Sequence, residues 1–184
     1  MGYINKGLVQ YKGAPLIAHV VARLLPQVSS VYISANEDLE KYAAFGCEVI
    51  QDAPQWRGKG PLAGIASVLE HLSDETILQV VSCDGPLIPK DLVAVLQAAR
   101  NKLDGTKRIV YPKTAEREHY LYLQGEVKEL KQIYALLAQD DLRIRALLQA
   151  LSAVAVEFDD ERAFVNCNSP QDIERLEEEN HEKL

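Results

Sequence analysis

Polar side chains recur where apolar, strand-like stretches of this sequence end. Asn36 follows "VYISA", Asp52 follows "CEVIQ", Asp84 follows "LQVVSC", and Asn166 and Asn168 stand in "AFVNCNSP". Taken singly, Asn and Asp are ordinary residues of turns and helix caps. In an open parallel sheet, however, the carboxyl ends of the strands meet at one edge, and ligands bind there. The recurrence therefore predicts a ligand site at that edge.

Asp84 is the most informative of these residues. It ends an apolar run within "ILQVVSCDGPLIP" (77–89), and the chain then breaks at once on Gly85 and Pro86. A carboxylate at the end of a central strand is costly to desolvate unless a cation, hydrogen-bond donors or a solvated cleft lies beside it. We therefore expect a partner for Asp84.

Two other stretches could contact a nucleotide or a phosphate. In "GKGPLAGI" (58–65), Gly60, Pro61 and Gly64 surround a predicted helix start, where the backbone and the helix N-terminus can approach a phosphate or a flat base. The same residues are also compatible with a simple flexible turn. Lys6 follows a turn containing glycine and could reach a phosphate as a point charge, although most lysines are merely solvated. The residues alone leave both alternatives open.

The sequence does not support a histidine metal site, a redox-active cysteine pair or a catalytic serine. The histidines are far apart and lack the spacing of metal ligands. The three cysteines are scattered, without a CxxC pair, which fits a reducing compartment. Ser67 and Ser82 have no evident base partner, so the sequence does not predict nucleophilic catalysis.

Length and charge narrow the class of protein. The chain has 184 residues, which predicts a single domain spanning 1–184. A net charge of -7 at pH 7 argues against a general nucleic-acid surface but does not exclude a single nucleotide. No apolar run reaches the roughly 20 residues of a membrane span, and no signal peptide is evident. We expect a cytoplasmic protein without membrane contact, as a monomer or weak homo-oligomer.

Short β-rich runs alternate with longer amphipathic ones, which predicts an α/β fold. Strands are predicted at 8–11, 30–35, 47–51, 77–82, 108–112, 120–124 and 153–158. Helices are predicted at 15–25, 37–45, 61–72 and 89–103, with two more between 126 and 151 and a last one from 170, capped by Ser169 and Asp172. The expected architecture is a three-layer α/β/α sandwich with a Rossmann-like, mostly parallel sheet, in which 108–112 and 120–124 pair antiparallel.

The order of these motifs resembles the molybdenum cofactor guanylyltransferases, nucleotidyltransferases that join the GMP part of GTP to molybdopterin. The pieces that carry the resemblance are "KGL", "GAPLIAHV", "SANED", "VIQDAP", "GPLAGI", "CDGPLIPKDL" and "FVNCNSPQDIE". In order and spacing they cover almost the whole chain. "CDGPLIP" after "GPLAGI" is fairly specific within the larger nucleotidyltransferase group, and "FVNCNSP" narrows it further.

The resemblance implies a reaction and a role for each matching residue. The terminal phosphate of the pterin would attack the α-phosphorus of GTP in line, with pyrophosphate leaving and Mg²⁺ and Lys6 stabilising the developing charge. Lys6 and Asp84 would be catalytic, and Asp84 would hold Mg²⁺. The implied nucleotide contacts are Lys6, Asn36, Asp52, Gly60, Pro61, Leu62, Gly64 and Asp84. The implied pterin contacts are Arg143, Asn166 and Asn168.

The chain departs from the family pattern at its start. The family opens with a strand and a phosphate loop of the form L-A-G-G, whereas the resemblance here begins inside that motif, at Met1 and Gly2. The resemblance therefore implies a domain that is incomplete at its N-terminus, with two inner strands lacking a ladder partner. Tyr3 and Tyr120 also stand where the family commonly has glycine and proline.

Alternatives to GMP transfer follow from this departure and from the breadth of the group. One is a related nucleotidyltransferase that uses CTP or a sugar phosphate. Another is a catalytically silent protein that binds nucleotide or pterin. The expected partners are GTP and molybdopterin, and the resemblance allows transient contacts with molybdoenzyme maturation proteins.

Overall fold

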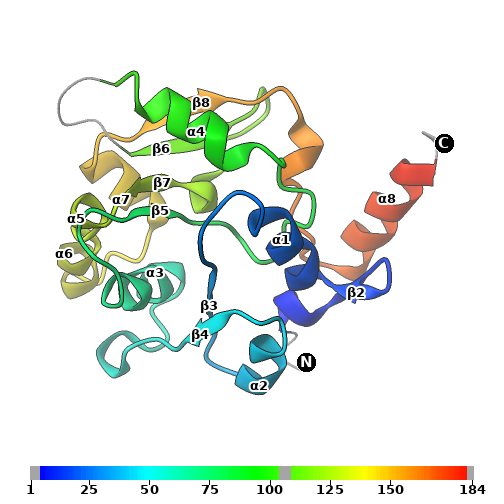
Figure 1. The fold of residues 1–184 in the computed structure, drawn as a ribbon, viewed down its shortest axis with the longest axis horizontal. Coiled ribbons are helices and arrows are strands. Elements are labelled where there is room, and N and C mark those ends of the chain that lie inside the picture. The colour runs from blue at the N-terminus through cyan, green and yellow to red at the C-terminus, as the bar shows by residue number, and fades with distance from the viewer. Residues whose placement is uncertain (1–4, 104–108, 182–184) are drawn as a thin grey trace.

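The structure is a computed structural model that describes residues 5–103 and 109–181 (Figure 1). Its α-helices are α1 (Leu16–Leu24), α2 (Leu39–Ala43), α3 (Pro61–Leu69), α4 (Leu92–Arg100), α5 (Val127–Leu130), α6 (Ile133–Ala138), α7 (Ile144–Ala150) and α8 (Pro170–His181). Its strands are β1 (Gln10–Tyr11), β2 (Ala14–Pro15), β3 (Tyr32–Ser34), β4 (Glu48–Ile50), β5 (Ile77–Gln79), β6 (Val110–Lys113), β7 (Gln124–Glu126) and β8 (Val154–Glu157). None of the helices among these residues is long and apolar enough to cross a bilayer.

The strands form two separate sheets besides a small hairpin. β3 pairs with β4 in parallel, and a second sheet has the order β5-β7-β6-β8. Within the second sheet β6 and β8 are parallel, whereas β7 is antiparallel to both β5 and β6. The α/β class is confirmed, and the sheet is mixed because β7 is inserted between two strands of the opposite direction.

Both faces of the four-stranded sheet are covered, which gives the expected three layers. Along β6, Tyr111 packs with Leu123 and residues of α3, α5, α6 and α7, whereas its neighbour Val110 packs on the opposite face with residues of α1 and α4. Successive side chains of a strand point to opposite faces, so this strand is buried on both sides. Figure 1 shows α4 lying over the sheet and α3, α5 and α6 grouped at its other side.

Helix α3 approaches β3 closely because its residues are small. Gly60 adopts a φ of 69°, and Pro61 occupies the first helical turn, where its missing N–H costs nothing. A Cβ atom at Gly64 would collide with Ser34 Oγ. Ser67 is buried, and its hydroxyl donates to the Ala63 carbonyl and accepts a hydrogen bond from the Ala53 amide. The loop after β4 is thereby tied to α3.

The two sheets face each other across a cavity between β3 and β5, without a ladder between them. β3 pairs only with β4, β5 pairs only with β7, and no other strand in the described part of the chain joins either one. β5 ends at Gln79 rather than at residue 82 as predicted, because residues 81 and 82 have no ladder partner among the described strands.

Several predicted elements are wrong in detail. The predicted strand 8–11 is a short 3₁₀ turn (Lys6–Leu8) followed by β1, which forms a hairpin with β2 because Lys12 and Gly13 adopt positive φ. Residues 120–122 are a 3₁₀ turn, so β7 begins only at Gln124, although its antiparallel pairing with β6 is confirmed. The chain from 126 to 151 forms three short helices rather than two. Residue 108 of the predicted strand 108–112 lies outside the described residues.

The cap of the last helix is confirmed. The Asp172 amide donates to Ser169 Oγ at 3.2 Å. In return, the Asp172 carboxylate accepts hydrogen bonds from the amides of Asn168 and Ser169. These bonds satisfy the free donors at the helix start and fix the "NCNSP" segment relative to α8.

Candidate functional site

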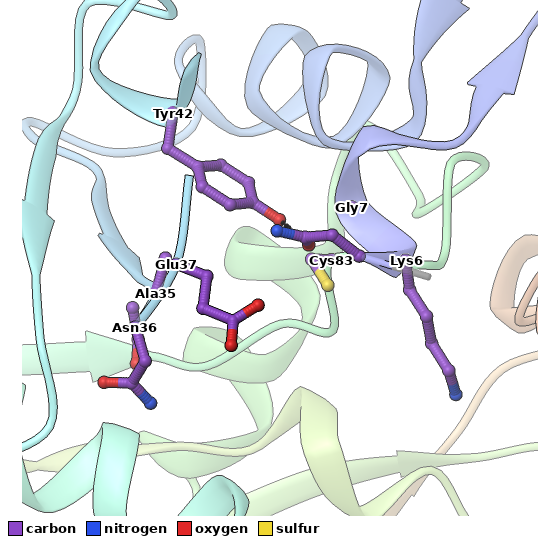
Figure 2. A pocket seen from close by; sticks show the side chains of 9 residues that line it. Lys6, Gly7, Ala35, Asn36, Glu37, Tyr42 and Cys83 are labelled. Carbon is purple, nitrogen blue, oxygen red and sulfur yellow. Dashed lines mark hydrogen bonds between the residues drawn. The ribbon is translucent and has the colours of Figure 1, made fainter. Parts of the chain in front are cut away.

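A polar pocket of about 390 Å³ lies at the carboxyl end of β3 (Figure 2). Its walls are the turn Asn5–Gly7, the segment Ser34–Glu37, Tyr42 of α2, and Cys83. Figure 2 shows Lys6 on one side of this pocket and Asn36 and Glu37 on the other. Segments far apart in the sequence thus contribute to one cavity at the edge where a ligand was predicted.

Asn36 and Asp52 form a reciprocal pair at this edge. Asn36 Nδ2 donates to Asp52 Oδ2 at 2.8 Å, and the Asp52 amide donates to Asn36 Oδ1 at 2.9 Å. The two residues follow β3 and β4, which are parallel neighbours. Asp52 is only 6 % exposed, whereas Asn36 faces solvent. The pair therefore presents the Asn36 amide to the polar pocket, and both side chains line a second cavity beside it.

Lys6 reaches across to the C-terminal part of the chain. Its ammonium donates to Asn168 Oδ1 at 2.6 Å. The preceding Asn5 donates to Asp38 at 3.1 Å and accepts a hydrogen bond from the Tyr42 hydroxyl, which holds the turn against α2. A Cβ atom at Gly7 would lie 2.6 Å from the Tyr42 hydroxyl, so the turn requires glycine at that position. The exposed ammonium is consequently held at a fixed place beside the pocket.

Asp84 is buried rather than exposed at the end of its strand segment. It is 7 % exposed, and Ser82 Oγ donates to Asp84 Oδ1 at 2.5 Å. Its carbonyl accepts the Cys167 amide at 2.9 Å, which joins the strand end to the "NCNSP" segment. The second carboxylate oxygen has no hydrogen bond of its own among those found for the described residues, and the adjacent Cys83 rather than Asp84 itself lines the pocket.

The donors at this edge fit magnesium bound together with a substrate. The described residues contain no group of three or more His, Cys, Asp and Glu side chains that could hold a metal ion by themselves. Mg²⁺ needs no such cage, because it keeps several waters and is usually held by one or two carboxylates plus substrate phosphates. Asp84 supplies one carboxylate with the hard oxygen donors that this ion prefers.

Asn166 lies beside Gly85, the residue that follows Asp84. The buried Tyr122 hydroxyl donates to Asn166 Oδ1 at 3.1 Å. A Cβ atom at Gly85 would collide with the Tyr122 hydroxyl, so glycine is needed after Asp84 for this contact. Burial and the nearby Asp84 charge raise the pKa of Tyr122, which keeps the hydroxyl protonated as a donor.

The pocket contains no activated nucleophile. Burial, and secondarily the charge of Asp84, raise the pKa of Cys83 to about 11. The thiol is therefore neutral near pH 7, and neutral thiols are poor nucleophiles. The chemistry open to this site is that of positioning and electrostatic stabilisation of a charged ligand.

The remaining predicted nucleotide contacts do not line the polar pocket. Gly60, Pro61 and Gly64 line a second cavity beside Asn36 and Asp52. The Leu62 side chain is fully buried in the core on α3, so only its backbone can face a ligand.

Arg143 lies at the start of α7 and is paired with Asp141 at 2.7 Å. This ion pair and associated hydrogen bonds lower the pKa of the Asp141 carboxyl to about 2. Arg143 lines neither of the two cavities described here. The structure does not bring it together with the other predicted site residues.

Some residues of the site were missed from the sequence. Glu37 and Tyr42 line the pocket, and Tyr122 and Ser82 hold its asparagine and aspartate. Glu37 stands in the quoted "SANED" motif and could have been found by its position beside Asn36. Tyr42 and Tyr122 read as ordinary apolar positions of a helix and a strand, so no sequence signal distinguished them.

Comparisons with known proteins agree on one group. A family model described as "MobA-like NTP transferase domain" matches residues 1–157. The molybdenum cofactor guanylyltransferase of Ralstonia pickettii is 34% identical over 188 residues, covering 97% of this chain and 90% of that protein. The enzyme of the same name from Photobacterium profundum is 35% identical, covering 96% of this chain and 88% of that protein.

Solved structures support the fold. Molybdopterin-guanine dinucleotide biosynthesis protein A from Archaeoglobus fulgidus superposes with a TM-score of 0.76 at 22% identity, covering 97% of this chain and 92% of that chain. The 2-C-methyl-D-erythritol 4-phosphate cytidylyltransferase from Thermus thermophilus superposes with a TM-score of 0.70 at 18% identity, covering 96% and 94% of the two chains. At these identities the likeness establishes the architecture only.

Proposed function

Because this chain belongs to the MobA-like NTP transferase family, we propose that it transfers GMP from GTP to molybdopterin, with release of pyrophosphate. The relatives that share about a third of its sequence are named for that guanylyltransfer. The observation that carries the proposal is that Lys6 and Asn36 line one pocket, with Asp52 hydrogen-bonded to Asn36 and Asp84 directly after the lining residue Cys83.

The nucleotide would occupy the polar pocket. The Asn36–Asp52 pair offers a fixed hydrogen-bonding surface for the nucleoside, with Gly60, Pro61 and Gly64 giving backbone access beside it. Lys6 would donate to the phosphates as a point charge. Its present partner, Asn168 Oδ1, keeps the ammonium aimed across the strand ends before a phosphate arrives.

Transfer needs no covalent intermediate on the protein. The terminal phosphate of the pterin attacks the α-phosphorus of GTP, the new P–O bond forms, and the bond to the β-phosphate breaks as pyrophosphate leaves. Lys6 stabilises the charge that develops on the phosphates. Asn166 and Asn168, fixed by Tyr122 and by the cap of α8, are the groups proposed to orient the pterin.

Magnesium would be held by Asp84. When bound, the ion would neutralise charge on the triphosphate oxygens and favour departure of pyrophosphate. The Ser82 hydroxyl donates to one Asp84 oxygen and so orients the carboxylate with the other oxygen free.

The test is a transfer assay with GTP labelled at the α-phosphate, molybdopterin and Mg²⁺. We expect label in a pterin dinucleotide and an equal amount of pyrophosphate. Asp52→Asn keeps the size of the side chain and is expected to weaken use of GTP, whereas Asp140→Asn, at an exposed ion pair with Lys59, is the matched control. Transfer of CMP from CTP, or transfer of the nucleotide to a sugar phosphate, would contradict the proposed substrates.

A second candidate is nucleotide binding without transfer. It is favoured by one observation, the cavity between β3 and β5 that shares Ser34, Asn36 and Cys83 with the polar pocket and that no strand of the described residues fills. A site with fewer fixed backbone donors stabilises a transferring phosphate less. GTP binding with no label transferred would support this candidate over the first.

A further inference from the structure

The loop between β4 and α3 carries two of the backbone positions that face the candidate nucleotide site. Gly58 and Gly60 line the same cavity as Asn36 and Asp52. The loop leads directly into the first turn of α3, where a Cβ atom at Gly64 would lie 3.7 Å from Asp52 Oδ1. A nucleoside held by the Asn36–Asp52 pair would therefore lie against the backbone of this loop.

Local steric restraints do not fix the path of this loop, residues 54–60. Gly58 and Gly60 adopt φ angles of 81° and 69°. A Cβ atom at either position would meet no atom of a described residue within 4 Å, apart from its chain neighbours. Glycine populates many backbone conformations, so these positions allow the loop more than one path. A contact elsewhere in the loop must therefore hold the two glycines in place.

Trp56 provides such a contact, because its ring packs on α6. The rings of Trp56 and Tyr134 are stacked, with centroids 5.2 Å apart and planes inclined by 23°. Both side chains are half-buried and pack against the core cluster of α3, α5, α6 and α7. The Tyr134 hydroxyl also donates to the Ala66 carbonyl of α3 at 3.4 Å. Trp56 thus stacks on a ring that is held jointly by α6 and by the neighbouring α3 (Figure 1).

Two turns transmit the position of Trp56 to the glycines. The Trp56 amide donates to the Ala53 carbonyl at 2.8 Å, and the Lys59 amide donates to the Trp56 carbonyl at 3.0 Å. Gly58 lies inside the second of these turns, and Gly60 follows it. A displacement of Trp56 would therefore displace Gly58 and change the way in which Gly60 enters α3.

Lys59 supplies a second, weaker side-chain contact for the loop. Its ammonium donates to the Leu137 carbonyl at 3.2 Å and pairs with Asp140 at 2.8 Å. The Asp140 side chain is exposed, and exposed ion pairs contribute little because water screens them. A stacked pair of aromatic rings contributes more than its buried area alone. The stack is therefore the stronger of the two anchors.

We infer that Trp56 is a positioning residue, which acts through its stack on Tyr134 to hold the Gly58–Gly60 backbone against the bound nucleotide. The identity of that nucleotide rests on the proposed function. The two glycines face the nucleoside rather than the reacting phosphorus, so their contacts stabilise the bound substrate and the transition state equally. Loss of such uniform binding raises KM and leaves kcat nearly unchanged.

The test compares GTP binding and transfer in the wild-type chain and in variants at Trp56. Trp56→Leu keeps an apolar side chain but removes the stack. We expect the dissociation constant and the KM for GTP to rise about three- to tenfold, with kcat changed less than about twofold. Trp56→Phe keeps a ring that can stack on Tyr134 and should restore most of the affinity. Calorimetric titration gives the dissociation constant, and the labelled transfer assay gives KM and kcat.

A double-mutant cycle tests whether Trp56 acts through Tyr134. Tyr134→Leu should raise the dissociation constant for GTP by a similar factor. The double variant should bind no more weakly than either single variant, because both changes remove the same contact. Trp56 is the chain's only tryptophan, so its fluorescence also reports on the stack without nucleotide. In Tyr134→Leu the emission should shift to longer wavelength as the indole becomes more hydrated.

Tyr120→Leu is the matched control. Tyr120 is also half-buried and contacts another ring, that of Tyr111, with centroids 5.6 Å apart. Tyr120 lines neither of the two cavities described here. We expect Tyr120→Leu to lower the melting temperature about as much as Trp56→Leu does, and to leave the dissociation constant for GTP unchanged.

Three outcomes would overturn the inference. They are equal GTP dissociation constants in the wild type and Trp56→Leu, additive losses in the double variant, and an equal loss of affinity in Tyr120→Leu. GTP binding that follows the expected series without any transfer would contradict the proposed function alone. GMP transfer with equal KM in the wild type and Trp56→Leu would contradict the positioning role alone, and a wild-type chain that binds no GTP would contradict both.

Discussion

The four-stranded sheet and the β3–β4 pair differ in how many strand edges are paired and in how completely their side chains are buried. In the four-stranded sheet, β6 and β7 each have ladder partners on both sides and apolar clusters on both faces. In the pair, β3 has one ladder partner among the described strands, and its other edge faces the cavity of about 670 Å³ between β3 and β5. The inner strands of the four-stranded sheet are therefore paired on both edges, whereas β3 is paired on one.

The difference shows where stability and binding are located. Most of the fully buried large side chains belong to the four-stranded sheet and its helices, among them Tyr122, Leu123, Leu130 and Ile133. The Asn36–Asp52 pair, by contrast, stands at the end of the less supported pair of strands. Asp84 and the "NCNSP" segment connect the site to the better packed region on one side, and α3 connects it on the other, through Ser67 and Gly64. The candidate site therefore spans the boundary between the four-stranded half and the β3–β4 half of the molecule.

The largest expected effect is on stability, in the four-stranded half. Leu123→Ala removes a fully buried side chain and should lower the free energy of unfolding by about 2–5 kcal/mol. Ile33→Ala in β3 should fall at or below the lower end of that range, because the neighbouring cavity lets its surroundings relax. Urea unfolding of the two variants measures this difference, and equal losses would remove the distinction between the two halves.

The next largest expected effect is on the rate of transfer, at Asp84. Asp84→Asn keeps the shape of the side chain but removes its charge, and should lower the transfer rate about 100-fold or more. Its stability should change little, because the charge itself contributes nothing to packing. Ser82→Ala is the control that removes the hydrogen bond to Asp84 while keeping the carboxylate. Full activity of Asp84→Asn would exclude the proposed magnesium role.

A pH-dependent effect on stability is expected from His119, in the four-stranded half. His119 stacks on Phe164 with ring centroids 4.4 Å apart, and burial lowers its pKa to about 4. Between that value and the unfolded pKa of about 6.5 the unfolded chain binds the extra proton, so stability falls as the pH drops through this window. The slope is at most about 1.4 kcal/mol per pH unit for one proton. Urea unfolding at pH 7 and pH 5 should show a smaller loss for His119→Gln, and an unchanged loss would assign the acid sensitivity to other groups.

The smallest expected effect is on GTP binding, through Lys6. Lys6→Ala should weaken GTP binding by about tenfold, since it removes one solvent-exposed charge opposite the phosphates. Arg143→Ala is its matched control, because Arg143 also is an exposed cation but pairs with Asp141 outside both cavities. A GTP dissociation constant that is unchanged in Lys6→Ala, or equally changed in both variants, would show that Lys6 is merely solvated.

The sequence predicted the parts of this fold that depend on local patterns. The strand-end residues Asn36 and Asp52 were placed at one edge by their spacing after apolar runs, and Ser169 and Asp172 were recognised as a helix cap. The α/β class followed from alternation of the same patterns. These features are set by residues close together in the chain, so periodicity and capping rules reach them.

The prediction from sequence was incomplete where contacts between residues far apart in the chain determine the structure. Residues 120–124 have strand-like composition, but Tyr122 turns inward to donate to Asn166, which is 44 positions away. Arg143, which the resemblance assigned to the pterin, pairs locally with Asp141, and its distance from the other site residues depends on where the fold places α7. The burial of Asp84 also depends on the segment around Cys167 rather than on its own neighbours. No local pattern encodes such contacts.

The central claim is that this chain binds GTP at the boundary between its two halves. Calorimetric titration of GTP with Mg²⁺ into the purified chain, with CTP and ATP as controls, tests it most directly. The account predicts saturable binding that is selective for GTP and weakened in Asp52→Asn. No binding by a folded chain, or equal binding of all three nucleotides unaffected by that substitution, would contradict it.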